Sequence, residues 1–155
     1  FGESGDANHI TSPVIDGPLR AMKAAFEMAK NITGEYPKID YINVHGTSTP
    51  VGDKNETSAI KELFGGKEKC PPVSSTKGQI GHCLGAAGAI EAIFTIKALN
   101  EGIIPPTINI ENQDPECDLD YIANVARKAD LTTVMSNNFG FGGTNGSVIF
   151  KKYTK

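Results

Sequence analysis

The stretch from Ile39 to Asp53 reads IDYINVHGTSTPVGD and holds the parts of one strand-loop-helix unit. Ile39–Val44 is short, rich in β-forming residues and bounded by proline and glycine, which predicts a buried strand. His45 falls at the C-terminal end of that strand. A helix is expected to begin at Asp53, because residues 53–56 have the acidic spacing of a capping box.

The same order of elements recurs further along the chain. Pro72–Thr76 (PVSST) predicts a second short strand, Lys77–His82 a loop, and Cys83–Asn100 a helix. That helix is rich in glycine and alanine, which permits close packing against a sheet, so we expect it to be central and buried. Each of two successive βα loops therefore carries a histidine, His45 in the first and His82 in the second.

The flanking segments complete one domain. Gly17–Asn31 has the apolar spacing of an amphipathic helix, whereas the chain beyond residue 106 predicts strands. The expected strands are Thr107–Ile110, Tyr121–Val125, Leu131–Asn137 and Ser147–Tyr153, the last two forming a hairpin around FGFGGTNG. Alternating strands and helices followed by consecutive strands predict an α/β domain over residues 1–155, with a mixed sheet and layered helices.

Composition excludes several classes of partner. The net charge of -3 offers no basic field for a nucleic acid or an anionic membrane. The most apolar region, Ile80–Leu99, is interrupted by charged residues, which indicates a buried helix rather than a membrane span. The cysteines have no metal or disulfide spacing, which favours a reducing cytoplasm; they are Cys70, Cys83 and Cys117. A Cys83–His82 nucleophile pair is rejected, because consecutive helical side chains diverge.

The two histidines are the first candidates for chemistry. Ligands collect beyond the C-terminal ends of parallel strands, so His45 and His82 are expected to meet there. A lone histidine is more often structural, and His9 keeps that interpretation. Glu91 lies on an apolar helix and needs a cationic partner, because an unpaired buried charge is unfavourable; Lys77 is the nearest candidate.

Other residues have two readings each. Thr47 and Thr49 either turn the chain or line a channel for a polar ligand arm. Gly140–Gly146 is no dinucleotide fingerprint, because a strand follows it, but its glycines leave amides free for an anion or oxyanion. Phe139 and Phe141 are either core residues or, on this flexible loop, a gate.

Three stretches together resemble the C-terminal half of β-ketoacyl-acyl-carrier-protein synthases, the condensing enzymes of fatty-acid synthesis. They are VHGTSTPVGD (residues 44–53), SSTKGQIGHCLGAAGAIEA (74–92) and SNNFGFGGTNGSVIF (136–150). The resemblance covers essentially the whole chain and is best to the elongating type II enzymes. It implies a thiolase-like fold of two similar α/β halves, usually dimeric, of which this chain is the second half.

The resemblance also implies roles for particular residues. His45 and His82 match the family's two catalytic histidines, which stabilise the enolate formed when a malonyl thioester loses carbon dioxide. Lys77 matches the active-site lysine and Glu91 its carboxylate partner. The implied substrate contacts are Thr47 and Thr49 on the phosphopantetheine arm, the Phe141 amide at an oxyanion with its ring as a gate, and Phe139 and Gly142 beside the substrate.

The implied partners are acyl carrier protein, malonyl-acyl-carrier protein and the enzyme's own N-terminal half, with a homodimer when full length. No resident cofactor or metal is implied, because the phosphopantetheine arm belongs to the carrier protein. The family's nucleophile is a cysteine of the N-terminal half, so the chain alone is expected to be inactive. Two alternatives stay open: a polyketide ketosynthase, and a non-catalytic partner subunit of the chain-length-factor type.

Overall fold

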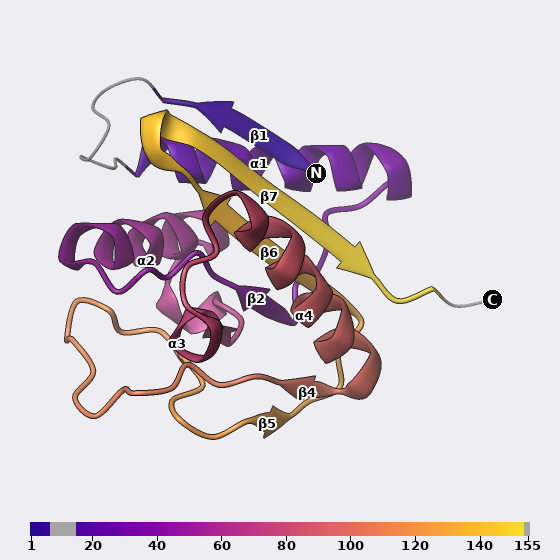
Figure 1. Cartoon of the computed structure of the whole chain (residues 1–155). Helices are drawn as coiled ribbons and strands as arrows, with labels where there is room; N and C mark the ends of the chain where they lie inside the picture. The colour runs from indigo at the N-terminus through magenta and orange to yellow at the C-terminus, as the bar shows by residue number, and fades with distance from the viewer. Residues whose placement is uncertain (7–14, 154–155) are drawn as a thin grey trace.

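The computed structural model describes residues 1–6 and 15–153, so His9 lies outside the described residues. Figure 1 shows strands and helices in layers. The strands are β1 (Gly2–Gly5), β2 (Tyr41–Asn43), β3 (Val73–Ser74), β4 (Ile103–Ile104), β5 (Arg127–Lys128), β6 (Thr133–Phe139) and β7 (Thr144–Lys151). The helices are α1 (Asp16–Thr33), α2 (Pro50–Phe64), α3 (Lys77–Ile80) and α4 (Ala87–Glu101).

The main sheet is mixed, which confirms the predicted fold class. Its strand order is β1-β7-β6-β2-β3, and β4 pairs with β5 in a separate two-stranded sheet. Strand β2 runs parallel to both β3 and β6, whereas β7 is antiparallel to both β1 and β6. Asn43, the last residue of β2, pairs with Ser136 on one side and Ser74 on the other. The residues that follow β2 and β3 therefore leave the sheet at the same edge.

The sheet is buried on both faces because side chains alternate along each strand. Ile42 and Met135 pack into the core formed with α1 and α2. Their neighbours Tyr41 and Val134 face the other way and pack with Leu99 of α4. In Figure 1, α4 accordingly lies on the opposite face of the sheet from α1. Burial on both faces is typical of parallel strands covered by helices.

Helices α1 and α2 confirm the two predicted amphipathic helices, but α2 begins at Pro50 rather than Asp53. Proline is favourable in the first helical turn, because its fixed φ suits the helix and its missing N–H needs no partner there. The predicted capping box does not form. Asp53 accepts instead from the Ser48 N–H (3.1 Å), and Glu56 binds the loop that carries His45.

The second unit differs from its prediction in two ways. The expected loop Lys77–His82 contains a single helical turn, α3, and the helix expected from Cys83 begins at Ala87 after a 3₁₀ turn. Helix α4 is not buried all round, since Ile93 is 58% exposed. Helix α4 packs on the sheet through one face, whose buried residues are Ala87, Glu91, Thr95, Ala98 and Leu99. The prediction that the glycine- and alanine-rich run would be buried is wrong for Gly85, Ala86 and Ala89, which are exposed.

The last third of the chain is less extended than predicted. The hairpin of β6 and β7 is confirmed. Thr107–Ile110 and Tyr121–Val125 form no strand and meet at one bridge, between Thr107 and Ala123. Left-handed backbone at three positions interrupts both segments: Asn109 (φ 67°), Ile122 (φ 47°) and Asn124 (φ 60°). Strands β1, β4 and β5 were not predicted, because GESG, II and RK carry little local strand signal.

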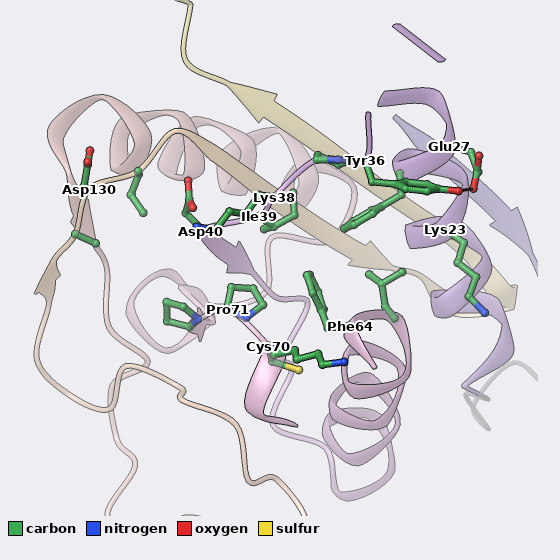
Figure 2. Close-up of a pocket in the computed structure, with 17 residues that line it drawn as sticks. Lys23, Glu27, Tyr36, Lys38, Ile39, Asp40, Phe64, Cys70, Pro71 and Asp130 are labelled. Carbon is green, nitrogen blue, oxygen red and sulfur yellow. Dashed lines mark hydrogen bonds between the residues drawn. The ribbon is translucent and has the colours of Figure 1, made fainter. Parts of the chain in front are cut away.

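A pocket of about 990 Å³ lies where the chain enters β2, β3 and β6 (Figure 2). Its walls are largely apolar, and at its rim the Tyr36 hydroxyl donates to Glu27 at 2.5 Å. Burial raises the pKa of the Cys70 thiol in its wall, which leaves little reactive thiolate. This pocket lies at the edge opposite to the histidine loops and offers no activated group. None of the helices in the described ranges is long and apolar enough to cross a membrane.

Candidate active site

The two histidine loops meet, as predicted from their places at the ends of β2 and β3. The ring centroids of His45 and His82 lie 5.4 Å apart with an interplanar angle of 82°. The ring of Phe139, at the end of β6, lies 6.0 Å from that of His45. Three elements that are distant in the sequence thus bring two imidazoles and an aromatic ring to one edge of the sheet.

The two imidazoles line a pocket of about 1510 Å³. The other predicted site residues in its wall are Thr47, Thr49, Phe139, Phe141 and Gly142. Lys77 and Glu91 are not part of this lining; they lie buried behind it. The sequence therefore predicted both an inner pair and an outer wall of one cavity.

His82 has a defined tautomer. Its Nδ1 accepts a hydrogen bond from the backbone N–H of Leu84 at 3.1 Å. The neutral ring must then carry its proton on Nε2, which makes that nitrogen a hydrogen-bond donor. The reason given for rejecting a Cys83–His82 pair was wrong, because both residues precede α4. The Cys83 thiol instead points to the carbonyl oxygens of Ile80 (3.8 Å) and Gly81 (3.9 Å).

His45 is held in its neutral form. Burial lowers the pKa of its imidazole to about 3, and the positive charge of Lys77 acts in the same direction. His82 adds a smaller effect of the same sign, while the Asn138 side chain opposes it. A neutral imidazole at neutral pH donates one N–H and keeps one lone pair, so the His45 ring can donate a hydrogen bond without bringing a full charge.

The lowered pKa of His45 predicts a pH effect on stability. An unfolded histidine has a pKa near 6.5, so the unfolded chain binds the proton first. The contribution of this residue is present above about pH 6.5 and is lost as the pH falls toward about 3. The stability difference between wild type and His45→Gln should shift against wild type over that range, by up to ~1.4 kcal/mol per pH unit in urea unfolding. A difference that is independent of pH would contradict this prediction.

The predicted ion pair between Lys77 and Glu91 is confirmed. The Lys77 ammonium donates to Glu91 Oε1, and the two side chains are 6% and 1% exposed. Asn138 of β6 donates from Nδ2 to the other carboxylate oxygen at 3.0 Å. Sequence reasoning missed Asn138, although its place at the end of the predicted strand, just before the glycine-rich turn, was a usable signal. The pair fixes α3 against α4 directly beneath the histidines.

Glu56 was also missed, because its spacing from Asp53 was interpreted as a capping box. Its two carboxylate oxygens accept the backbone N–H groups of His45 and Gly46, each at 2.9 Å. Burial raises the pKa of Glu56 to about 7, while the two N–H groups and the charge of Lys77 oppose that rise. Through these two hydrogen bonds, the Glu56 side chain holds the backbone of the histidine loop against the inner face of α2.

The outer wall combines hydroxyls and an aromatic ring. The hydroxyl oxygens of Thr47 and Thr49 lie 3.4 Å apart at the start of α2. Phe141 is 78% exposed, which excludes the core reading, whereas Phe139 is half-buried against the core. Phe141 stands on the turn between β6 and β7, where Gly142 adopts φ 76°. Glycine suits such left-handed backbone because it has no Cβ.

The backbone of Gly46 is a sensitive point of the site. Its φ is 39°, and a Cβ added there would lie 2.8 Å from the Cβ of Ser75. Gly46→Ala should therefore lower the free energy of unfolding by about 2–4 kcal/mol, from backbone strain plus a clash. Gly34→Ala is the control, because Gly34 has φ 87° but open space around it, and about 1 kcal/mol is expected from strain alone. Equal losses in urea unfolding would contradict the predicted clash.

Residues 1–6 and 15–153 contain no cluster of three or more metal-binding side chains. All three cysteines are described, are unpaired and lie outside the lining of the histidine pocket. The lining of this pocket presents the two imidazoles, the hydroxyls of Thr47 and Thr49, and carboxyl groups that include those of Asp53 and Glu56.

Comparison with known proteins agrees with this fold. Residues 1–111 match the family described as "Beta-ketoacyl synthase, C-terminal domain". The chain belongs to this family of condensing-enzyme domains.

Individual members of the family are similar to this chain over nearly its whole length. The 3-oxoacyl-[acyl-carrier-protein] synthase 2 of Staphylococcus aureus (strain COL) is 50% identical over 156 residues, which cover 99% of this chain and 37% of the relative. A β-ketoacyl synthase structure from Burkholderia phymatum STM815 is 43% identical with a TM-score of 0.88, over 99% of this chain and 36% of that one. The ishigamide ketosynthase/chain length factor is 39% identical with a TM-score of 0.89, over 99% and 37%. The chain thus spans little more than a third of the length of these proteins.

Proposed function

We propose that this chain is the decarboxylating part of the active site of an elongating 3-oxoacyl-acyl-carrier-protein synthase II. The observation that carries the proposal is the pair of imidazoles, His45 and His82, with centroids 5.4 Å apart at one pocket. The bond between the carboxylate and the α-carbon of a malonyl thioester breaks, carbon dioxide leaves, and the electron pair becomes an enolate. N–H groups of both imidazoles stabilise the enolate oxygen, where negative charge develops.

The enolate then attacks an acyl group held as a thioester on a cysteine. A carbon–carbon bond forms, and the cysteine thiolate is the leaving group. The lining of the histidine pocket includes none of the three cysteines of this chain, which supports a nucleophile supplied by the N-terminal half. In this proposal the Phe141 amide donates to the oxyanion of the attack step, and the exposed Phe141 ring gates the pocket.

The substrate arm has a matching wall. The hydroxyls of Thr47 and Thr49 stand at the pocket and suit the amide groups of a phosphopantetheine arm. Phe139 and Gly142 supply surface beside the substrate. The arm belongs to the acyl carrier protein, so the domain needs no cofactor of its own. Acyl carrier protein and malonyl-acyl-carrier protein are thus the proposed partners, in the cytoplasm.

The open face around α4 supports contact with the rest of the enzyme. Leu84 and Ile93 are 72% and 58% exposed, and Ile96 is 38% exposed. Apolar side chains gathered on one face favour burial against another protein surface. We propose that the N-terminal half covers this face and that the intact enzyme is a homodimer.

The test of the function uses the intact protein with malonyl-acyl-carrier protein and saturated acyl-carrier-protein primers. Formation of 3-oxoacyl product with one carbon dioxide per condensation is expected. Absence of product with every saturated primer would contradict the proposal.

The similarity to the ishigamide ketosynthase/chain length factor favours two alternative functions, a polyketide ketosynthase and a non-catalytic partner subunit. Turnover of polyketide starters in preference to saturated primers would indicate a polyketide ketosynthase. A non-catalytic partner subunit would lack a nucleophilic cysteine in its N-terminal half, and the sequence of that half decides this point directly.

A further inference from the structure

The main chain of Gly46, next to His45, is hydrogen-bonded through both its N–H and its carbonyl. Its N–H donates to Glu56 Oε2 at 2.9 Å, and its carbonyl accepts from the Ser75 hydroxyl at 2.7 Å. The N–H of His45 itself donates to Glu56 Oε1, also at 2.9 Å. Three hydrogen bonds therefore fix the main chain at the point where the His45 imidazole is attached.

Glu56 is buried and bonded to the His45 loop, unlike the solvent-exposed glutamates that are usual on a helix. It is 5% exposed on the inner face of α2, and its two oxygens each receive one N–H of the loop. A carboxylate that accepts through both oxygens has a single orientation, and it resists rotation of the loop about either bond. Buried polar groups that are fully paired in this way make a loop rigid.

Ser75 ties the first histidine loop to the second. Its hydroxyl donates to the Gly46 carbonyl and accepts from the N–H of Lys77 at 3.3 Å. Its own N–H donates to the Thr107 hydroxyl at 3.0 Å, and the residue is 6% exposed. The loop that carries His45, between β2 and α2, and the turn that leads to His82 thus share one buried hydroxyl.

We propose that Glu56 and Ser75 are positioning residues that fix the His45 imidazole relative to His82 and Lys77 for decarboxylation. This inference rests on the proposed function of the two histidines. Ser75 lies outside the lining of the histidine pocket. Glu56 is part of that lining, but both of its carboxylate oxygens accept backbone N–H groups, so in this proposal both residues act through the backbone of the His45 loop. A donor displaced by about 1 Å loses a large part of its transition-state stabilisation, commonly about a hundredfold in rate.

The experiment uses the intact protein with Glu56→Gln and Ser75→Ala. Glutamine accepts only one of the two N–H groups, and alanine removes the link to the Gly46 carbonyl. Decarboxylation of malonyl-acyl-carrier protein should lose about 10- to 100-fold in kcat, with KM and the rate of acyl transfer to the nucleophile changed by less than about threefold. The smaller Ser75→Ala change carries the test if Glu56→Gln fails to fold.

Thr57→Val is the matched control. Thr57 neighbours Glu56 on α2 and is equally buried, but its hydroxyl bonds the Asp53 carbonyl (2.7 Å) and the Tyr121 hydroxyl instead of the histidine loop. It should lower the melting temperature and leave kcat unchanged. A loss of kcat in Thr57→Val that matches those of the two test variants would mean that general destabilisation, not positioning, is measured, and would overturn the inference.

A double replacement separates the inference from the function beneath it. In the residual rate of His45→Ala, adding Glu56→Gln should cause no further loss, because Glu56 acts only through His45. Equal losses in both backgrounds, or wild-type kcat in both positioning variants, would overturn the inference. Wild-type decarboxylation by His45→Ala alone would instead overturn the proposed function.

Discussion

Breaking the Lys77–Glu91 pair from one side should lower the free energy of unfolding by about 3–5 kcal/mol. Both side chains are almost fully buried, and each is the counterion that the charge of the other needs. Lys77→Met leaves a carboxylate with Asn138 alone, whereas Glu91→Gln leaves an ammonium facing a neutral amide. Either charge then stays buried without its counterion, which is the main source of the loss.

An exposed ion pair on α4, the helix that carries Glu91, is the control. Lys97 and Glu101 form an ion pair at 3.0 Å, with side chains 62% and 53% exposed. Lys97→Ala should change stability by less than about 1 kcal/mol, since water screens such a pair. Urea unfolding at neutral pH measures the stability loss of the buried-pair variants and of the Lys97→Ala control. The account of the buried pair is wrong if Glu91→Gln leaves both folding and activity unchanged.

Removing either imidazole should lower the condensation rate of the intact enzyme by about 10²- to 10³-fold. In the proposed mechanism each ring supplies one N–H donor to the enolate: Nε2 in the case of His82, because its Nδ1 is occupied by the Leu84 N–H. Alanine at either position leaves the pocket open and the opposing donor in place. The expected change is in kcat, with KM for the malonyl substrate little affected, because the donors act on charge that develops in the transition state.

The two histidine variants should also combine in a characteristic way. The rings lie 5.4 Å apart and, in the proposed mechanism, act on one oxygen, so their losses are not expected to add. His45→Ala/His82→Ala should therefore be little slower than the worse single variant. Purely additive losses in steady-state kinetics would indicate that the two rings serve separate steps.

The meeting of the two histidines was predictable because it follows from topology. Residues after parallel strands leave the sheet at one edge, and His45 and His82 both follow such strands. The Lys77–Glu91 pair was predictable for a different reason: a carboxylate on an apolar helix face must find a cation. Both features follow from local sequence and one general rule, without the details of packing.

The missed features depend on contacts that the sequence does not display. The edge strand β1 reads GESG and forms only because β7 offers it a partner far along the chain, as in the pairing of Gly2 with Ser147. Glu56 matched a local capping pattern, yet α2 begins earlier at Pro50 and turns that carboxylate inward. At both places long-range packing, not the local pattern of residues, decides the structure.

The open side of α4 shows the same limit from another direction. Helix α4 does pack on the sheet, but most of the small residues at its start are exposed, and a helix pattern that is apolar all round does not say how many neighbours are present. Ile93 and Ile96 stay exposed in this chain, on the face that we assign to the rest of the enzyme.

The central claim is that this chain supplies the groups that decarboxylate malonyl thioesters. The most direct measurement is release of carbon dioxide from malonyl-acyl-carrier protein by the intact enzyme, with no acyl primer present, in wild type and in His82→Ala. The account predicts at least about a hundredfold slower release in the variant, with malonyl-acyl-carrier protein still bound. Release at the wild-type rate by His82→Ala would contradict it.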